Sequence, residues 1–500
     1  MDYLFLVLYL VLPSLIAIHL LSATNKRSES NKKNLPPGPW PIPIFGNLVR
    51  HGDKPHVGLT QLAEKHGPLM TLQLGQVQTV VISSASMAKE ALKTHDISFC
   101  NRRTVDVFHA ERYNENSAVW LPVGPQWRNI RKFCTVHILS TARLVSSERL
   151  RRNKVNDLIA YVQKCNESGL SVDIGQAVFT TSLNLLSCTF FSEDLGDPNS
   201  ELAREFKTTI RALMEEAGKL NFANYFPILR KIDLQGGRRR ASVHMKKIIN
   251  IFNNLIDQRL KGKRVSNSLQ DIDILDVLLG FDNDGAHKIE TSKIPFLLLD
   301  VFIGGTDTSS STVEWAMAEL LQKPEKLKKA QAELRENIGK GNALDESHIF
   351  RLPYLRAVVK ETLRLHPPVP ILAPRKVDAD VMIFGFTVPK KAELLINVWA
   401  IGRDPDTWKH PNSFEPERFL GSEIDFKGHD FELIPFGAGR RMCLGLPLAI
   451  RMLHLVLGSL IHRFDWKLEA GVSAANMDME ERYGITLAKA KTLRAVPCIF

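Results

Sequence analysis

One cysteine in a glycine-rich loop is the side chain of this 500-residue sequence best suited to chemistry. Residues 436–445 read FGAGRRMCLG, with Cys443 two positions after Arg441. Glycine tolerates positive φ and has no side chain, so this backbone can lie close against a flat partner. The apolar run 446–464 predicts a buried helix, whose first N–H groups and positive dipole favour a thiolate at Cys443. A flat, anionic partner bound by thiolate indicates haem, with Arg441 placed to pair with an acidic group on it.

Two other readings of the cysteine are weaker. A lone cysteine is usually a buried structural residue, and no second cysteine stands two to four residues away, as a zinc site would need. The loop, however, fits F-x-x-G-x-R-x-C-x-G at every fixed position, and in this it resembles the haem-binding loop of the cytochrome P-450 family. The resemblance implies that Cys443 ligates the iron of haem b and that Phe436 and Gly437 lie against the cofactor. Leu444 departs from the pattern, since plant members often carry proline there.

A long apolar helix is predicted over residues 291–321, with the sequence GGTDTS (304–309) in its middle. Two glycines and several hydroxyl side chains predict a local widening of the helix there. An acid beside a hydroxyl in apolar surroundings is costly unless partnered, which marks Asp307 and Thr308 as functional. The stretch resembles the oxygen-activation motif of the family. It implies that Asp307 and Thr308 relay protons during catalysis.

Other motifs stand in the order that the family resemblance requires. Trp127 and Arg131 are four residues apart and so share one helix face, which resembles the W-x-x-x-R motif. The resemblance implies that a haem propionate is held by Trp127, Arg131, Arg375 and Arg441. It also implies a structural triad made of Glu361, Arg364 and Arg418.

The candidate substrate pocket is almost wholly apolar. By similarity it is lined by Phe302, Ile303, Val369, Ile371, Leu372 and Ile485. A charged substrate would need a partner in such a lining, whereas the polar run 114–117 could hold one hydroxyl. Residues 431–435, 445–449 and 478–490 resemble a plant group that includes geraniol 8-hydroxylase-like terpenoid hydroxylases. Enzymes that oxidise abietane diterpenes, and others that hydroxylate tyrosine on the betalain route, resemble the same group.

Length and composition favour one large domain. Pro (26) and Gly (30) are scattered and do not gather in a linker, and the sequence reads as mainly α with a small β portion, including a hairpin over 70–82. The six cysteines are far apart, which indicates a reducing compartment without disulfides. The net charge of +11 favours an acidic protein or an anionic membrane as partner. No nucleic-acid motif accompanies that charge.

The N-terminus predicts attachment to a membrane. Residues 1–24 read as a transmembrane anchor, 25–45 as a basic and proline-rich hinge, and 46–500 as the haem-thiolate monooxygenase domain. A cleaved signal peptide is the alternative, but it lacks a basic leading region, and the lysines after the apolar run keep the domain cytosolic. We therefore expect single-pass insertion in the endoplasmic reticulum. The apolar break at 221–227 either dips into the membrane or is a packed loop.

The sequence as a whole predicts a monooxygenase that acts on a small lipophilic molecule with O2. Electrons would come from NADPH through NADPH-cytochrome P-450 reductase, whose acidic face suits the basic candidates Arg128, Lys132 and Arg440. A thiolate-haem isomerase or dehydratase is a rival, but it would not need the acid–alcohol pair. A haem sensor or electron carrier is a second rival, and it would need neither that pair nor a lipophilic entrance.

Overall fold

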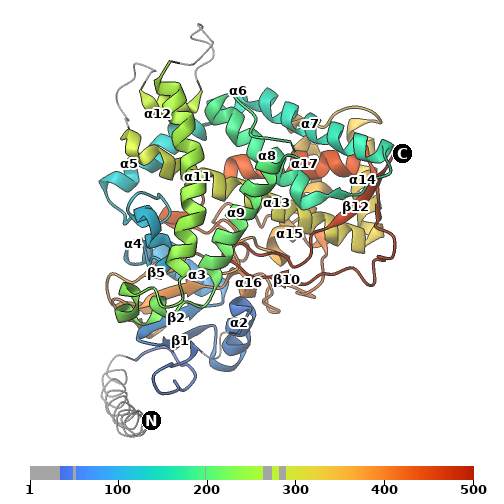
Figure 1. Ribbon diagram of the computed structural model, residues 1–500. Coiled ribbons are helices and arrows are strands. Elements are labelled where there is room, and N and C mark those ends of the chain that lie inside the picture. The colour runs from blue at the N-terminus through green and yellow to red at the C-terminus, as the bar shows by residue number, and fades with distance from the viewer. Residues whose placement is uncertain (1–33, 49–51, 198, 263–272, 281–288, 500) are drawn as a thin grey trace, which may run out of the picture.

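A computed structural model describes residues 34–48, 52–197, 199–262, 273–280 and 289–499 (Figure 1). The predicted anchor and the first part of the hinge, up to residue 33, lie outside the described residues. The remainder of the hinge runs beside the first strand, where Thr71 N donates to Pro37 O at 2.8 Å.

The described chain is mainly helical, as predicted (Figure 1). The longer helices are α2 Pro55–His66, α5 Pro125–Phe133, α7 Glu148–Glu167, α8 Ile174–Phe191, α9 Glu201–Gly218, α11 Gly237–Leu260, α13 Ile294–Gln322, α14 Pro324–Ile338, α15 Pro353–Leu365 and α17 Leu446–Arg463. The shorter ones are α3 Ala85–Lys89, α4 Asp96–Phe99, α6 Thr141–Ser146, α10 Phe222–Tyr225, α12 Ile274–Leu279 and α16 Val398–Ile401.

Helix α13 is the central element of the molecule. It contacts α8, α9, α11, α14, α15 and α17, and most of its residues are buried. The predicted helix 291–321 is thus confirmed, with a 3₁₀ turn Thr291–Lys293 before it and Pro295 in its first turn, where the missing N–H costs nothing. The predicted widening is wrong, because residues 304–309 remain α-helical. Residues 446–463 form α17, as predicted.

A five-stranded sheet, in the order β1-β2-β8-β5-β3, lies at one end of the helical body (Figure 1). Its strands are β1 Leu69–Leu74, β2 Val77–Ile82, β8 Glu393–Ile396, β5 Arg375–Lys376 and β3 Asn101–Arg102. The β1–β2 pair is the predicted hairpin, and Gly75 in its turn has φ +56°. In the β3–β5 pair, Arg102 stands opposite Arg375, so two arginines far apart in sequence become neighbours.

Three smaller sheets complete the β portion. They consist of β4 Val172–Asp173, β12 Arg494–Cys498 and β9 Asp465–Leu468; of β6 Val381–Ile383 and β7 Phe386–Val388; and of β10 Glu481–Arg482 and β11 Ala488–Lys489. The turn between β10 and β11 carries Ile485, one of the predicted pocket residues.

The apolar break at 221–227 folds as the short helix α10 and packs on the hairpin. Gln76 N donates to Tyr225 O at 2.9 Å, and the rings of Phe45 and Phe222 are 6.4 Å apart. Among the described helices, α8 alone has the length and hydropathy of a membrane span. Since 78% of that window is buried inside the protein, core packing accounts for its apolar composition. All six cysteines are described, and all are free.

Candidate active site

The glycine-rich loop 436–445 is a compact turn that leads into α17. Cys443 N donates to Phe436 O at 3.0 Å and closes the turn. Gly437 and Gly439 both have φ +68°, the left-handed region that favours glycine. A Cβ on Gly439 would also collide with the carbonyl oxygen of Leu92, so this position requires glycine for space as well as for conformation.

Cys443 faces an interior space. Its side chain retains accessible area although it lies deep in the protein. Burial raises the pKa of its thiol, opposed by hydrogen bonds from the backbone N–H groups of Gly445 and Leu446 and by the charge of Arg131. These N–H groups belong to the start of α17, where the helix dipole also favours an anion. Burial outweighs these effects and favours the neutral thiol, so a thiolate at this position needs the further stabilisation that binding a metal supplies.

Four arginines converge beside this loop: Arg102, Arg131, Arg375 and Arg441. Burial lowers the pKa of Arg375 to about 10, and burial together with the charge of Arg375 lowers that of Arg441 to about 10. Burial, followed by the charges of the other three, holds the pKa of Arg102 well below its usual value.

Positive charge is in excess at this cluster. Asp96 lies 3.7 Å from Arg375 Nη1, but it also pairs with Arg440 at 2.8 Å. Within the described chain, the buried Nε atoms of Arg102 and Arg375 have no hydrogen-bond partner. A planar dianion bound through a thiolate, as haem is, fits this set of donors.

All four predicted propionate ligands donate to backbone carbonyls, Arg131 to Met442 O at 3.2 Å and Arg375 to Phe99 O at 3.1 Å. Trp127 Nε1 donates to Ala118 O at 3.1 Å, and Arg441 donates to Cys100 O at 2.7 Å and to Ala118 O at 3.2 Å. The guanidinium groups of Arg131 and Arg441 lie 5.0 and 4.7 Å from the Trp127 ring centroid. In this structure Trp127 and Arg441 therefore hold the shape of the cluster through backbone carbonyls and ring contacts.

Arg102 is the site residue that the sequence did not reveal. Its strand is two residues long, which leaves no periodic pattern to recognise. Only the register of β3 against β5 brings it beside Arg375.

Helix α13 presents Gly304 and Thr308 on one side. Gly304 is exposed although it stands in the middle of a buried helix, and a Cβ there would meet nothing within 4 Å. Thr308 Oγ1 donates to Gly304 O at 2.6 Å. The hydroxyl therefore sits beside open interior space, and it can exchange its backbone bond for one to a ligand.

Asp307 points to a different side of α13, because consecutive helix residues do not share a face. Its side chain is 3% exposed, and its Oδ1 lies 3.8 Å from Nε of Arg211 on α9. Neither of these two atoms has a hydrogen-bond partner among the described residues. They border a small pocket, with room for about one water molecule, which Glu215, Arg482 and Tyr483 also line. Asp307 and Thr308 are thus brought near each other without a direct hydrogen bond.

For five of the six predicted pocket residues the assignment stays a prediction. Ile303, Val369, Ile371 and Ile485 are partly exposed, and Leu372 lies beside the loop, since a Cβ on Gly437 would be 3.7 Å from its Cδ1. Phe302 is the exception. It is fully buried, with ring centroids 5.0 to 6.1 Å from those of four other phenylalanines, Phe252, Phe191, Phe190 and Phe206. It belongs to the core between α8, α9, α11 and α13, not to a substrate lining.

The polar run 114–117 is not available to hold a substrate hydroxyl through Ser117. Ser117 is fully buried and donates to Asp300 Oδ1 at 2.7 Å, while Ala118 N donates to Asp300 Oδ2 at 2.7 Å and Tyr113 also donates to Oδ1. Burial raises the pKa of Asp300 to about 6, although these hydrogen bonds oppose the shift. Asp300 on α13 therefore fixes the segment 113–118. The carbonyl oxygen of Ala118 in this segment accepts hydrogen bonds from both Trp127 and Arg441.

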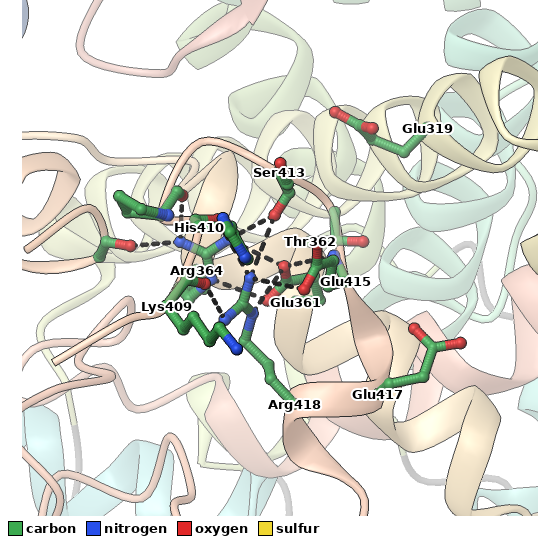
Figure 2. Close-up of polar contacts among 12 residues, drawn as sticks. Glu319, Glu361, Thr362, Arg364, Lys409, His410, Ser413, Glu415, Glu417 and Arg418 are labelled. Carbon is green, nitrogen blue, oxygen red and sulfur yellow. Dashed lines mark hydrogen bonds and ion pairs between the residues drawn. The ribbon is translucent and has the colours of Figure 1, made fainter. Parts of the chain in front are cut away.

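Glu361, Arg364 and Arg418 form one buried network (Figure 2). Glu361 accepts two hydrogen bonds from Arg364, at 2.7 and 2.8 Å, one from Arg418 at 3.0 Å and one from Glu415 N at 2.7 Å. Arg364 continues to the carbonyls of Pro411 and Ser413. The network joins α15 to the chain that precedes the cysteine loop, which is a scaffold role.

Comparison with known proteins agrees with this geometry. The family model for cytochrome P-450 matches residues 36–493, and the chain belongs to the cytochrome P-450 family. It is therefore a haem-thiolate monooxygenase, whose iron is carried by a cysteine thiolate. The family resemblance, the fold class and the haem cofactor predicted from the sequence are confirmed.

Particular relatives are similar along nearly their whole length. Geraniol 8-hydroxylase of Swertia mussotii is 52% identical over 482 residues, covering 96% of this chain and 97% of the relative. Geraniol 8-hydroxylase of Catharanthus roseus is 50% identical over 497 residues, 99% of each chain. Drimenol monooxygenase of Persicaria hydropiper is 48% identical over 498 residues, 99% of this chain and 97% of the relative.

Proposed function

We propose that this monooxygenase hydroxylates a terpenoid, and that its substrate is a monoterpene alcohol such as geraniol, attacked at an allylic methyl group. The observation that carries the proposal is the apolar character of Ile303, Val369, Ile371, Leu372 and Ile485. Asp300, the carboxylate on the nearby part of α13, is occupied by three donors. A zwitterion such as tyrosine would thus find no free counter-charge there. The names of the relatives support a terpenoid, and an abietane diterpenoid is the alternative of the same chemical kind.

Haem binding is assigned to residues of the loop and the arginine cluster. Cys443 is the thiolate ligand of the iron, and Phe436 and Gly437 lie against the cofactor. Trp127, Arg131, Arg375 and Arg441 hold the propionates, and Arg102 beside them supplies a further donor. Bound haem supplies the activation of O2.

Proton delivery is assigned to Asp307 and Thr308. Asp307 Oδ1 accepts a proton that bulk solvent delivers through water in the pocket that it shares with Arg211, and the 3.8 Å gap between the two side chains leaves both free to bind that water. Thr308 Oγ1 passes a proton toward the interior space after leaving Gly304 O. Because the two side chains are on different sides of α13, the transfer between them passes through water.

Electrons come from NADPH through NADPH-cytochrome P-450 reductase. Arg128 and Lys132 are exposed on α5, and Arg440 is half exposed in the cysteine loop. These cations and the net charge of +11 suit an acidic partner.

The enzyme is held at the endoplasmic reticulum membrane by the N-terminal anchor, with its catalytic domain in the cytosol. Large apolar side chains are exposed close to α10 and the hinge, namely Trp40, Phe45, Leu220, Ile228, Ile232 and Leu234. They support a second contact with lipid. Deletion of residues 1–33 should therefore release only part of the protein from membranes. Complete release would refute the second contact, and complete retention would refute the anchor.

Turnover separates the candidate substrates. The full-length protein, supplied with the reductase and NADPH, is offered geraniol, nerol, an abietane diterpene and tyrosine, with Cys443→Ser as the inactive control. We expect hydroxylation of geraniol and no reaction with tyrosine. Oxidation of tyrosine or the diterpene, with geraniol untouched, would refute the substrate assignment.

A further inference from the structure

A chain of buried acids and histidines lies away from the haem loop. Glu481 of β10 stands between two imidazoles: its Oε2 is 3.1 Å from His56 Nε2, and its Oε1 is 3.6 Å from His366 Nδ1. His366 Nε2 in turn is 2.8 Å from Glu319 Oε1 on α13. The four residues come from α2, β10, the end of α15 and α13. Glu319 lies apart from the Glu361 network (Figure 2), so this is a separate assembly.

The side chains of these four residues are almost completely buried. The side chains of His56, His366, Glu319 and Glu481 are 0%, 8%, 5% and 12% exposed. Burial by itself would raise the pKa of Glu319, but hydrogen bonding to His366, the charge of His366 and Lys323 lower it to about 2. In the same way, His366 and His56 hold the pKa of Glu481 well below its usual value against the effect of burial. Both acids are therefore anions whose stability depends on the neighbouring rings.

Contacts among these four residues fix one end of the β10–β11 hairpin. Tyr483 stacks on His56, with centroids 5.4 Å apart and planes at 21°. His56 thus holds the hairpin by its ring face and by its Nε2 atom. At the other end, the turn rests on Ile485 N donating to Met214 O at 3.2 Å and Leu487 N donating to Pro368 O at 2.8 Å. The pocket residue Ile485 lies in this turn, only four residues after Glu481.

We propose that Glu481, clamped between His56 and His366, is a positioning residue that sets where Ile485 lies against the substrate. The proposal rests on the proposed function for the identity of that substrate. Glu481 reaches neither substrate nor cofactor itself. Its effect passes along residues 481–485, because a strand that is fixed at Glu481 leaves the following turn little freedom.

Adjacent residues provide a matched set of variants. Glu481→Gln removes the charge and keeps the shape. Glu480→Gln is the control, since the Glu480 side chain is 72% exposed and pairs with Lys54 at the surface, where ion pairs contribute little. His56→Gln retains a donor toward Glu481, whereas His56→Leu keeps a similar volume and removes it. The second pair tests the hydrogen bond apart from the packing of the ring.

The first readout does not depend on the substrate. Hydrogen–deuterium exchange of the haem-loaded full chain reports opening of the turn at the N–H groups of Ile485 and Leu487. We expect exchange there to be about tenfold faster in Glu481→Gln and His56→Leu. Exchange should be close to wild type in Glu480→Gln, whereas His56→Gln, which loses only the ring contact with Tyr483, should lie between wild type and His56→Leu. Unchanged exchange in Glu481→Gln, or equal effects of the two His56 variants, would overturn the clamp.

The second readout is catalysis with geraniol. Glu481→Gln should raise KM about five- to tenfold and change the ratio of products, with a smaller change in kcat and an unaltered absorption spectrum of the thiolate haem with carbon monoxide. Faster exchange with unchanged KM and products would overturn the positioning role. A wild-type enzyme that ignores geraniol would refute the substrate proposal instead, and the exchange comparison would then decide the clamp alone.

Discussion

Asp300 is the residue whose replacement should most change how stability depends on pH. Asp300→Asn keeps the shape of the side chain and removes its charge. The amide oxygen can still accept from Tyr113 and Ser117, but the amide nitrogen takes the place of Oδ2 and cannot accept from Ala118 N. The variant therefore exchanges a desolvated charge for one lost hydrogen bond.

The magnitude follows from the pKa of Asp300, which burial raises from 3.8 to about 6 in the folded chain. Because the folded state binds this proton more tightly than the unfolded state, the group stabilises the fold at low pH, and this contribution is lost as pH rises between 3.8 and about 6. At about 1.4 kcal/mol per pKa unit, ionisation of Asp300 costs about 3 kcal/mol at neutral pH. About 1 kcal/mol of that loss falls between pH 5 and pH 7.

Urea unfolding of the haem-loaded protein at pH 5 and pH 7 measures this term. The free energy of unfolding of Asp300→Asn, relative to wild type, should increase by about 1 kcal/mol from pH 5 to pH 7. Glu115→Gln, in the same segment but 48% exposed, is the control and should show no such change. A constant difference between Asp300→Asn and wild type at the two pH values would mean that Asp300 ionises near its ordinary pKa, and the reasoning would be wrong.

Three further predictions concern the other parts of the site. Cys443→Ser should lose the long-wavelength absorption of the ferrous carbon monoxide complex, and a variant that keeps this band would remove Cys443 as ligand. Thr308→Ala should bind haem and substrate but divert reducing equivalents to peroxide, with product formation about 10²–10⁴-fold slower. Thr312→Ala, one turn away, is the control, and its NADPH consumption should remain coupled to product formation. Equal coupling in the two variants would refute the relay. Glu361→Gln should destabilise the fold by about 3–5 kcal/mol, since it breaks a fully buried ion pair. Glu415 is 40% exposed and 3.7 Å from Arg418, so Glu415→Gln should destabilise the fold by less than about 1 kcal/mol. Similar unfolding midpoints for the two variants would contradict a scaffold role.

Motifs that are local in sequence were predictable. The cysteine loop, the hairpin and the long helix α13 can each be recognised from no more than about thirty consecutive residues, because turn chemistry and hydrophobic periodicity are properties of neighbouring positions. The side chains of Trp127 and Arg131 are also in contact, as expected, since four residues make about one helical turn.

Contacts between distant segments were not predictable. Asp300 meets Ser117 across 183 positions, and His56 meets Glu481 across 425, with no pattern in either segment that names its partner. Phe302 shows the same limit within one helix. Periodicity says that a residue is on an apolar face, but the neighbouring helices decide whether that face meets a cavity or the core.

The arginine cluster has a consequence for how the protein is made in the cell. Arg102, Arg131, Arg375 and Arg441 repel one another, and a ligand that binds the folded chain but not the unfolded chain stabilises it by mass action. Haem supply should therefore govern the yield of newly synthesised protein as well as its activity. Chains translated faster than haem arrives would carry this repulsion uncompensated, and they would be preferred targets of proteolytic quality control.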